Sequence, residues 1–181
     1  MSILSIPTQD LKKITKLFTR KIGLFFLGVA GLYIDGVHFS EKFDYNQILI
    51  NSIMLVGFWL LYVRSTKRTK ELMVYAVIIG FIGEYFFSVF LDMYTYRLGN
   101  VPLYIPFGHA AVYARVYVFS KNSVVKKNHK ALEQFLYIVI SLFALGYLLF
   151  LNDVFGFVMT LGVFALLVKR PKDRMFFLTM Y

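Results

Sequence analysis

The 181-residue sequence has no cysteine, few prolines and only three histidines. The lack of cysteine excludes disulfides, thiolate nucleophiles and cysteine metal sites. Because three histidines without a compact ligand motif rarely hold a metal, we predict neither a metal site nor a cofactor. A Gly-rich phosphate loop, a serine nucleophile elbow and an HExxH motif are also missing. Any chemistry must therefore come from carboxylate, His, Tyr, Ser or Thr side chains.

Charged residues are also scarce. They make up 17% of the chain and hydrophobic residues 59%, against about 25% and about 45–50% in soluble domains. This composition predicts an all-α, polytopic transmembrane helical bundle that forms one integral membrane domain over residues 1–181. Long apolar runs place about six spans, which we predict at 22–39, 47–63, 72–96, 102–120, 135–151 and 153–168.

The twenty basic residues sort between alternate loops. All except Lys42 and Arg97 lie in four segments, which are 12–21, 64–70, 115–130 and 169–174. The positive-inside rule then predicts a cytoplasmic N-terminus and an even number of crossings, as in a bacterial inner (cytoplasmic) membrane. The net charge of +10 is therefore a topology signal, and it predicts anionic lipid headgroups as partners rather than nucleic acid.

Both ends of the sequence carry apolar residues beside basic ones. Residues 1–21 form a basic flank before an apolar run that continues through Asp35 and His38 without an A-x-A-like cleavage site, so we predict a retained first span and not a signal peptide. Leu11, Ile14 and Leu17 recur at helical spacing, which predicts a basic amphipathic interfacial segment; a frayed tail is the alternative. The C-terminal MFFLTMY, residues 175–181, is either the start of a seventh span in a longer protein or a short apolar foot in the interface.

The third predicted span has a carboxylate, Glu84, at its midpoint. An unpaired charge there costs at least about 2.5 kcal/mol, so Glu84 must be protonated, paired or in a wet cavity. At 100° per residue, one broad stripe, which we expect to face protein, consists of Gly80, Glu84, Ser88, Asp92 and Thr95. Residues 72–120 are therefore predicted to form a polar-cored helical hairpin.

The turn of this hairpin is RLGNVPLYIP, residues 97–106, in which Gly and Asn tolerate left-handed backbone and Pro begins the returning helix. With the tip near residue 98, His109 is expected level with Ser88. Arg115 is expected near the level of Glu84, where it either pairs with that carboxylate or extends to the cytoplasmic headgroups.

The order of Glu84, YTY at 94–96, LG at 98–99 and VPLYIP at 101–106 resembles a pattern in the carotenoid hydratase and lycopene-cyclase family of small helical membrane proteins. The resemblance covers residues 84–106. It implies a polyene or isoprenoid substrate, with Glu84 as proton donor to a carbon–carbon double bond and Tyr94 and Tyr96 lining the path of the cation.

The hairpin supplies two sets of candidate residues. The candidate catalytic residues are Glu84, Asp92 and His109. The candidate substrate-binding residues are Ser88, Tyr94, Tyr96, Asn100, Tyr113 and Arg115. For most of them a structural role is the alternative, such as a hydrogen bond that fixes packing or, for Asp92, an ion pair with Arg97.

Three functions compete. The first is an enzyme that acts on a membrane-embedded lipid or isoprenoid by acid catalysis from the intramembrane carboxylate. The second is a non-catalytic subunit or assembly factor, whose polar hairpin contacts a membrane protein partner. A small transporter is less favoured, because the sequence shows no internal repeat or broken helix.

The charge sorting gives a direct prediction about topology. In a Lys126→Cys variant, a membrane-impermeant thiol reagent should label the protein in opened cells and not in sealed cells. The natural chain has no cysteine, so no background labelling arises. Labelling of this residue from outside sealed cells would contradict the orientation.

Overall fold

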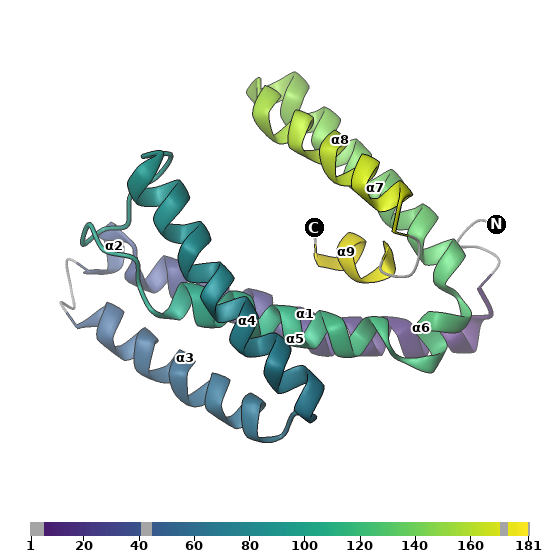
Figure 1. The fold of residues 1–181 in the computed structure, drawn as a ribbon, viewed down its shortest axis with the longest axis horizontal. Helices are drawn as coiled ribbons and strands as arrows, with labels where there is room; N and C mark the ends of the chain where they lie inside the picture. The colour runs from purple at the N-terminus through teal and green to yellow at the C-terminus, as the bar shows by residue number, and fades with distance from the viewer. Residues whose placement is uncertain (1–5, 41–44, 171–173, 181) are drawn as a thin grey trace. The chain divides into compact units, whose positions relative to one another are not determined.

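The computed structural model describes residues 6–40, 45–170 and 174–180; of residues 21–25, 27, 38 and 40 it describes the backbone alone. The chain divides into two compact units. The terminal unit comprises residues 1–18 and 118–181, and the central unit comprises residues 19–117. Within the described ranges the regular elements are all helices (Figure 1), which confirms the all-α prediction.

Three helices in the described chain are long and apolar enough to cross a membrane. They are α3 (Asn46–Val63), α4 (Lys67–Glu84) with its continuation η2 (Tyr85–Phe90), and α7 (His129–Leu151). Helix α8 (Val154–Val168) is apolar but shorter. Many of their apolar side chains face outward, such as Ile53 and Phe150 at 63% and 84% exposed, as lipid-facing positions must. The length and composition of these helices are consistent with the predicted helical membrane protein, while six crossings remain a prediction.

Helix α1 (Thr8–Asp35) is continuous, so no helix end separates the predicted interfacial segment from the predicted first span at residue 22. A short helix, α2 (Val37–Ser40), follows it. In the terminal unit Ile14 is 5% exposed and packs in a cluster with Phe119, Val125 and Leu132. Protein thus covers part of the face that the sequence assigned to the membrane interface.

The terminal unit is built around a hairpin of α7 and α8. Asn152 ends α7 in the left-handed region, with φ 54°, and the Asp153 carboxylate caps α8 by accepting from the Gly156 N–H at 2.8 Å. Helix α6 (Ser123–Lys127) precedes α7. Lys127 and Asn128 donate hydrogen bonds to Asp10, which hold the pKa of that carboxyl below its ordinary value.

The apolar C-terminal stretch forms a short helix. Helix α9 (Arg174–Met180) lies beside α7 (Figure 1). Leu178 is 2% exposed and packs with Ile140 and Leu167. Tyr181 lies outside the described residues. The residues that the sequence marked as the start of a further span therefore pack on the preceding helices.

The central unit places α3 beside α4 and brings α5 (Tyr104–Ser120) close to α4 (Figure 1). A Cβ added at Gly80 would lie 3.3 Å from the Pro106 Cα, so the glycine allows α4 and α5 to approach more closely than a larger residue would. Glu84 and Ser88, on the same stripe, are each 8% exposed. The prediction that this stripe faces protein is confirmed for these three residues. It is wrong for Asp92 and Thr95, which are exposed because they follow the end of the helix at Phe90.

We predict that Gly80→Val lowers the free energy of unfolding by about 1–3 kcal/mol, because its branched side chain must displace Pro106. Gly83→Val is the matched control, since a Cβ there meets no described atom within 4 Å. Thermal unfolding in detergent measures both. Equal stability of the two variants would show that the close approach of α4 and α5 is wrong.

Candidate functional site

The candidate site is organised by a reversal of the chain after Glu84. Helix α4 ends at Glu84, η2 continues as a single π-helical stretch to Phe90, and Asp92 has a left-handed φ of 49°. In a continuous α-helix, residues 94 and 96 would lie about 15 and 18 Å beyond Glu84. Instead, the Tyr94 and Tyr96 hydroxyls donate to Glu84 Oε2 at 2.8 and 2.6 Å.

The chain therefore turns back along its own helix. This corrects the predicted span 72–96, which ends at Phe90 because the residues after it return toward the carboxylate. Glu84 lies six residues before the helix end, and not at the midpoint of a span.

A third partner of Glu84 comes from α5. His109 Nε2 lies 3.0 Å from Glu84 Oε1 and forms an ion pair when protonated. The sequence placed Arg115 near the level of Glu84 and His109 level with Ser88. That register assumed an α-helix as far as residue 96, so it misplaced His109 by four residues, or about 6 Å along the helix. His109 is the basic partner of the carboxylate.

The geometry of these contacts locates the exchangeable proton. Glu84 Oε2 already accepts two O–H groups, which occupy its lone pairs. The proton that the carboxyl can exchange therefore lies between Oε1 and His109 Nε2. The Glu84 side chain is 10% exposed and that of His109 is 60% exposed. Glu84 is the enclosed member of the pair, and His109 is the member that surrounding molecules can reach.

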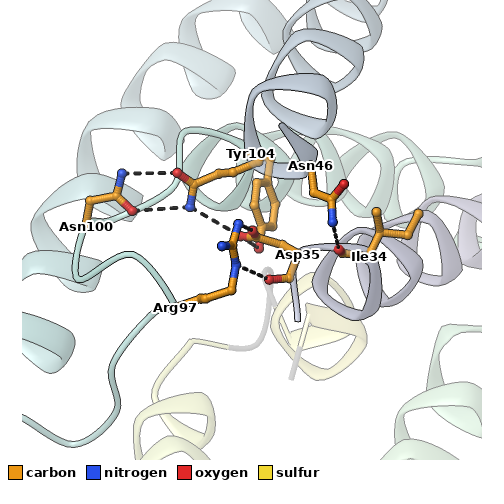
Figure 2. Close-up of polar contacts among 7 residues, drawn as sticks. Ile34, Asp35, Asn46, Arg97, Asn100 and Tyr104 are labelled. Atoms are coloured by element: carbon orange, nitrogen blue, oxygen red, sulfur yellow. Dashed lines mark hydrogen bonds and ion pairs between the residues drawn. The ribbon is translucent and has the colours of Figure 1, made fainter. Parts of the chain in front are cut away.

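A second buried carboxylate, Asp35, lies at the end of α1. It is 4% exposed. Arg97 donates to the Asp35 carbonyl at 2.9 Å and to Oδ1 at 3.2 Å, and the Tyr104 hydroxyl donates to Oδ2 at 3.0 Å (Figure 2). Gln47 Nε2 also reaches Oδ2, at 3.3 Å. Helices α1, α3 and α5 and the segment before α5 thus meet at one carboxylate.

Asn100 extends this Asp35 cluster and does not reach Glu84. Its amide pairs reciprocally with that of Gln47, at 3.2 and 3.1 Å (Figure 2). Asn46 Nδ2 donates to the Ile34 carbonyl at 2.9 Å. The sequence predicted Asn100 as a substrate-binding residue. In the structure its side chain instead forms this amide pair with Gln47.

Residues 91–103 are held by both carboxylates. Tyr94 and Tyr96 bind Glu84, while Arg97 binds Asp35. Gly99, with φ 66°, makes the turn between Arg97 and Asn100. We call residues 91–103 the return segment. Its hydrogen bonds fix the position of both tyrosine hydroxyls at Glu84.

The other predicted site residues have different positions. Asp92 is exposed and is not among the described hydrogen-bond partners of Glu84. Ser88 is buried about one turn after Glu84, and Tyr113 is half-buried one turn after His109. Within the described chain Arg115 Nε is buried without a hydrogen-bond partner, and the ion pair of Glu84 is with His109 instead.

Sequence reasoning missed the pairing of Asp35 with Arg97. A signal was present, because Arg97 and Lys42 are the only basic residues outside the four basic segments and an arginine there needs an acidic partner. Among the side chains that are described, no group of three His, Asp or Glu could hold a metal.

Comparison with protein-family models, curated proteins and solved structures gives no match. The resemblance of residues 84–106 to the carotenoid hydratase and lycopene-cyclase family therefore stays a prediction. The function of the chain has to be inferred from the geometry of Glu84, His109 and the return segment.

The Asp35 cluster gives a prediction about stability. Asp35→Asn leaves Arg97 without its counter-charge in a site where the Arg97 side chain is 19% exposed, and we expect a loss of about 3 kcal/mol. Glu71→Gln breaks the exposed Arg68–Glu71 pair and should cost less than about 0.5 kcal/mol. Unfolding in detergent compares the two, and similar losses would contradict the anchoring role of Asp35.

Proposed function

We propose that this chain is a multi-pass membrane protein that exchanges a proton with a membrane-embedded lipid or isoprenoid at the Glu84–His109 pair. One observation carries the proposal. An enclosed carboxylate, fixed by two tyrosine hydroxyls, is bound to a histidine whose side chain is 60% exposed on an apolar helix. A purely structural pair has no need of an exposed histidine within an apolar surface.

The arrangement gives each residue a distinct role. His109 is the group that gives and takes the proton, through Nδ1, because Nε2 is engaged by Glu84. Glu84 fixes the ring orientation and stabilises the protonated imidazole. Tyr94 and Tyr96 hold Glu84 in place, and their rings, 5.6 Å apart in an edge-to-face arrangement, can stabilise a nearby cation. The acid role that was predicted for Glu84 thus passes to His109.

These roles support a reaction in which a double bond of the lipid or isoprenoid shifts or the molecule cyclises. Protonated His109 transfers its proton to one carbon of a substrate double bond, which leaves a carbocation on the other carbon. A neighbouring carbon then loses a proton to His109, and a new double bond forms. The protein returns to its starting state and no co-reactant is consumed.

We also propose six crossings, by α1, α3, α4 with η2, α5, α7 and α8, in a bacterial cytoplasmic membrane with the N-terminus inside. The sorting of basic residues supports this orientation. Helices α5 and α8 have 17 and 15 residues, or about 25 and 22 Å. They need a locally thinned bilayer, because the usual hydrocarbon core is about 30 Å thick.

The test is lipid mass spectrometry on cells that express the wild-type chain or a variant. With wild type we expect a chain-dependent lipid that is an isomer of a host lipid. His109→Gln and Glu84→Gln should lower its formation about 10²–10⁴-fold, because each removes the proton exchange.

Asp92→Asn is the matched control, because it makes the same acid-to-amide change at an exposed carboxylate outside the Glu84 contacts. Its lipid profile should equal that of wild type. Thermal unfolding in detergent shows that each variant is folded. An unchanged profile in folded Glu84→Gln cells contradicts the proposal and favours the non-catalytic subunit or assembly factor.

A further inference from the structure

The terminal unit contains a basic cavity that the Glu84 site does not involve. This cavity has a volume of about 290 Å³ and lies where α7 begins. Its polar lining consists of Ser120, Lys121, Lys126, His129 and Glu133. Among the described lining residues, two lysines and a histidine outnumber one acid, and this excess of positive charge favours an anion. Met175 and Phe176 of α9 complete the wall with apolar surface.

A second cavity of the terminal unit is apolar. It has a volume of about 440 Å³ and is lined mainly by aliphatic and aromatic side chains of α7, α8 and α9. Leu136, Ile140 and Tyr147 line it on α7, Phe157 on α8 and Leu178 on α9. Its size falls within the range of about 300–1,000 Å³ typical of ligand sites.

The two cavities follow each other along the same face of α7. His129 and Glu133 line the basic cavity and Leu136, Ile140 and Tyr147 line the apolar one. These residues are spaced by four, three, four and seven, so they form one helical stripe. The apolar part, from residue 136 to 147, rises about 16 Å, which matches the depth of one leaflet, about 15 Å.

We propose that this stripe is the binding site of an anionic glycerophospholipid. Its phosphate lies in the basic cavity with Lys121, Lys126 and His129, and one acyl chain follows α7 into the apolar cavity. Two features select this ligand over a neutral lipid or a soluble phosphate ester: the positive charge at one end and the leaflet-length apolar surface at the other. Glu133 follows His129 by one turn of α7, and its negative charge repels an anion. The phosphate is therefore expected at His129 and not further along α7.

Native mass spectrometry of the delipidated full-length chain in detergent tests the headgroup. Phosphatidylglycerol should bind about tenfold more tightly than phosphatidylcholine with the same chains, because only the former is anionic. Lys121→Gln/Lys126→Gln should weaken phosphatidylglycerol binding about thirtyfold and leave phosphatidylcholine almost unchanged.

A control of equal charge is Arg64→Gln/Lys67→Gln, which removes two exposed basic residues of the central unit. It should change phosphatidylglycerol binding less than about twofold, as expected for surface charges away from the ligand. Equal losses in the two double variants, or no loss in the first, would overturn the proposal.

The acyl-chain part is tested by filling the apolar cavity. Ala144 lines this cavity and its neighbour Leu145 does not. Ala144→Phe should weaken binding of both lipids, and Leu145→Phe should not. Ala144→Leu is the milder variant if thermal unfolding shows that Ala144→Phe does not fold. Equal binding by all folded variants would contradict a chain in this cavity.

Glycerol phosphate distinguishes a lipid from a soluble ligand, because it carries the headgroup charge without an acyl chain. At equal concentration it should fail to displace phosphatidylglycerol. Displacement as effective as that by unlabelled phosphatidylglycerol would assign the basic cavity to a soluble phosphate ester and overturn the lipid proposal.

Discussion

A carboxylate on an apolar helix must have its oxygens hydrogen-bonded or its charge neutralised, and this constraint on Glu84 governs the fold of residues 85–109. Three partners satisfy Glu84, and two of them come from the segment that follows its own helix. The helix therefore ends early, through a π-helical stretch, and the chain returns. The short path back to α5 then brings His109 to the same carboxylate.

Asp35 completes the arrangement at the other end of the return segment. Arg97 lies one residue after Tyr96, so the ion pair with Asp35 and the hydrogen bonds to Glu84 restrain the same backbone. Tyr104, at the start of α5, also binds Asp35, and its backbone N–H donates to Asn51 Oδ1 on α3. Loss of Asp35 should therefore disturb the tyrosines at Glu84 as well as lower stability. The hydrogen bonds of Glu84 and those of Asp35 thus together hold the exposed His109 in position.

The sequence predicted much of the helical scaffold, because apolar runs and basic loops obey simple rules of length and charge. It also predicted the buried stripe of Gly80, Glu84 and Ser88 from helical periodicity. It did not predict where the third helix ends, since no Pro or Gly occurs between Glu84 and Arg97 to mark a break. The break is caused by the hydrogen bonds of Tyr94 and Tyr96 to Glu84, and the spacing of apolar residues in the sequence does not reveal such contacts. The error in the position of His109 has the same origin.

The most direct test of the central claim is ¹⁵N NMR of the histidines in lipid bilayers, with and without Glu84→Gln. The chain has only three histidines, so the signal of His109 can be assigned by a single substitution. If Glu84 shares a proton with His109, the His109 Nε2 resonance must move in the variant while the other two histidines keep theirs. An unchanged His109 resonance in folded Glu84→Gln protein would contradict the account.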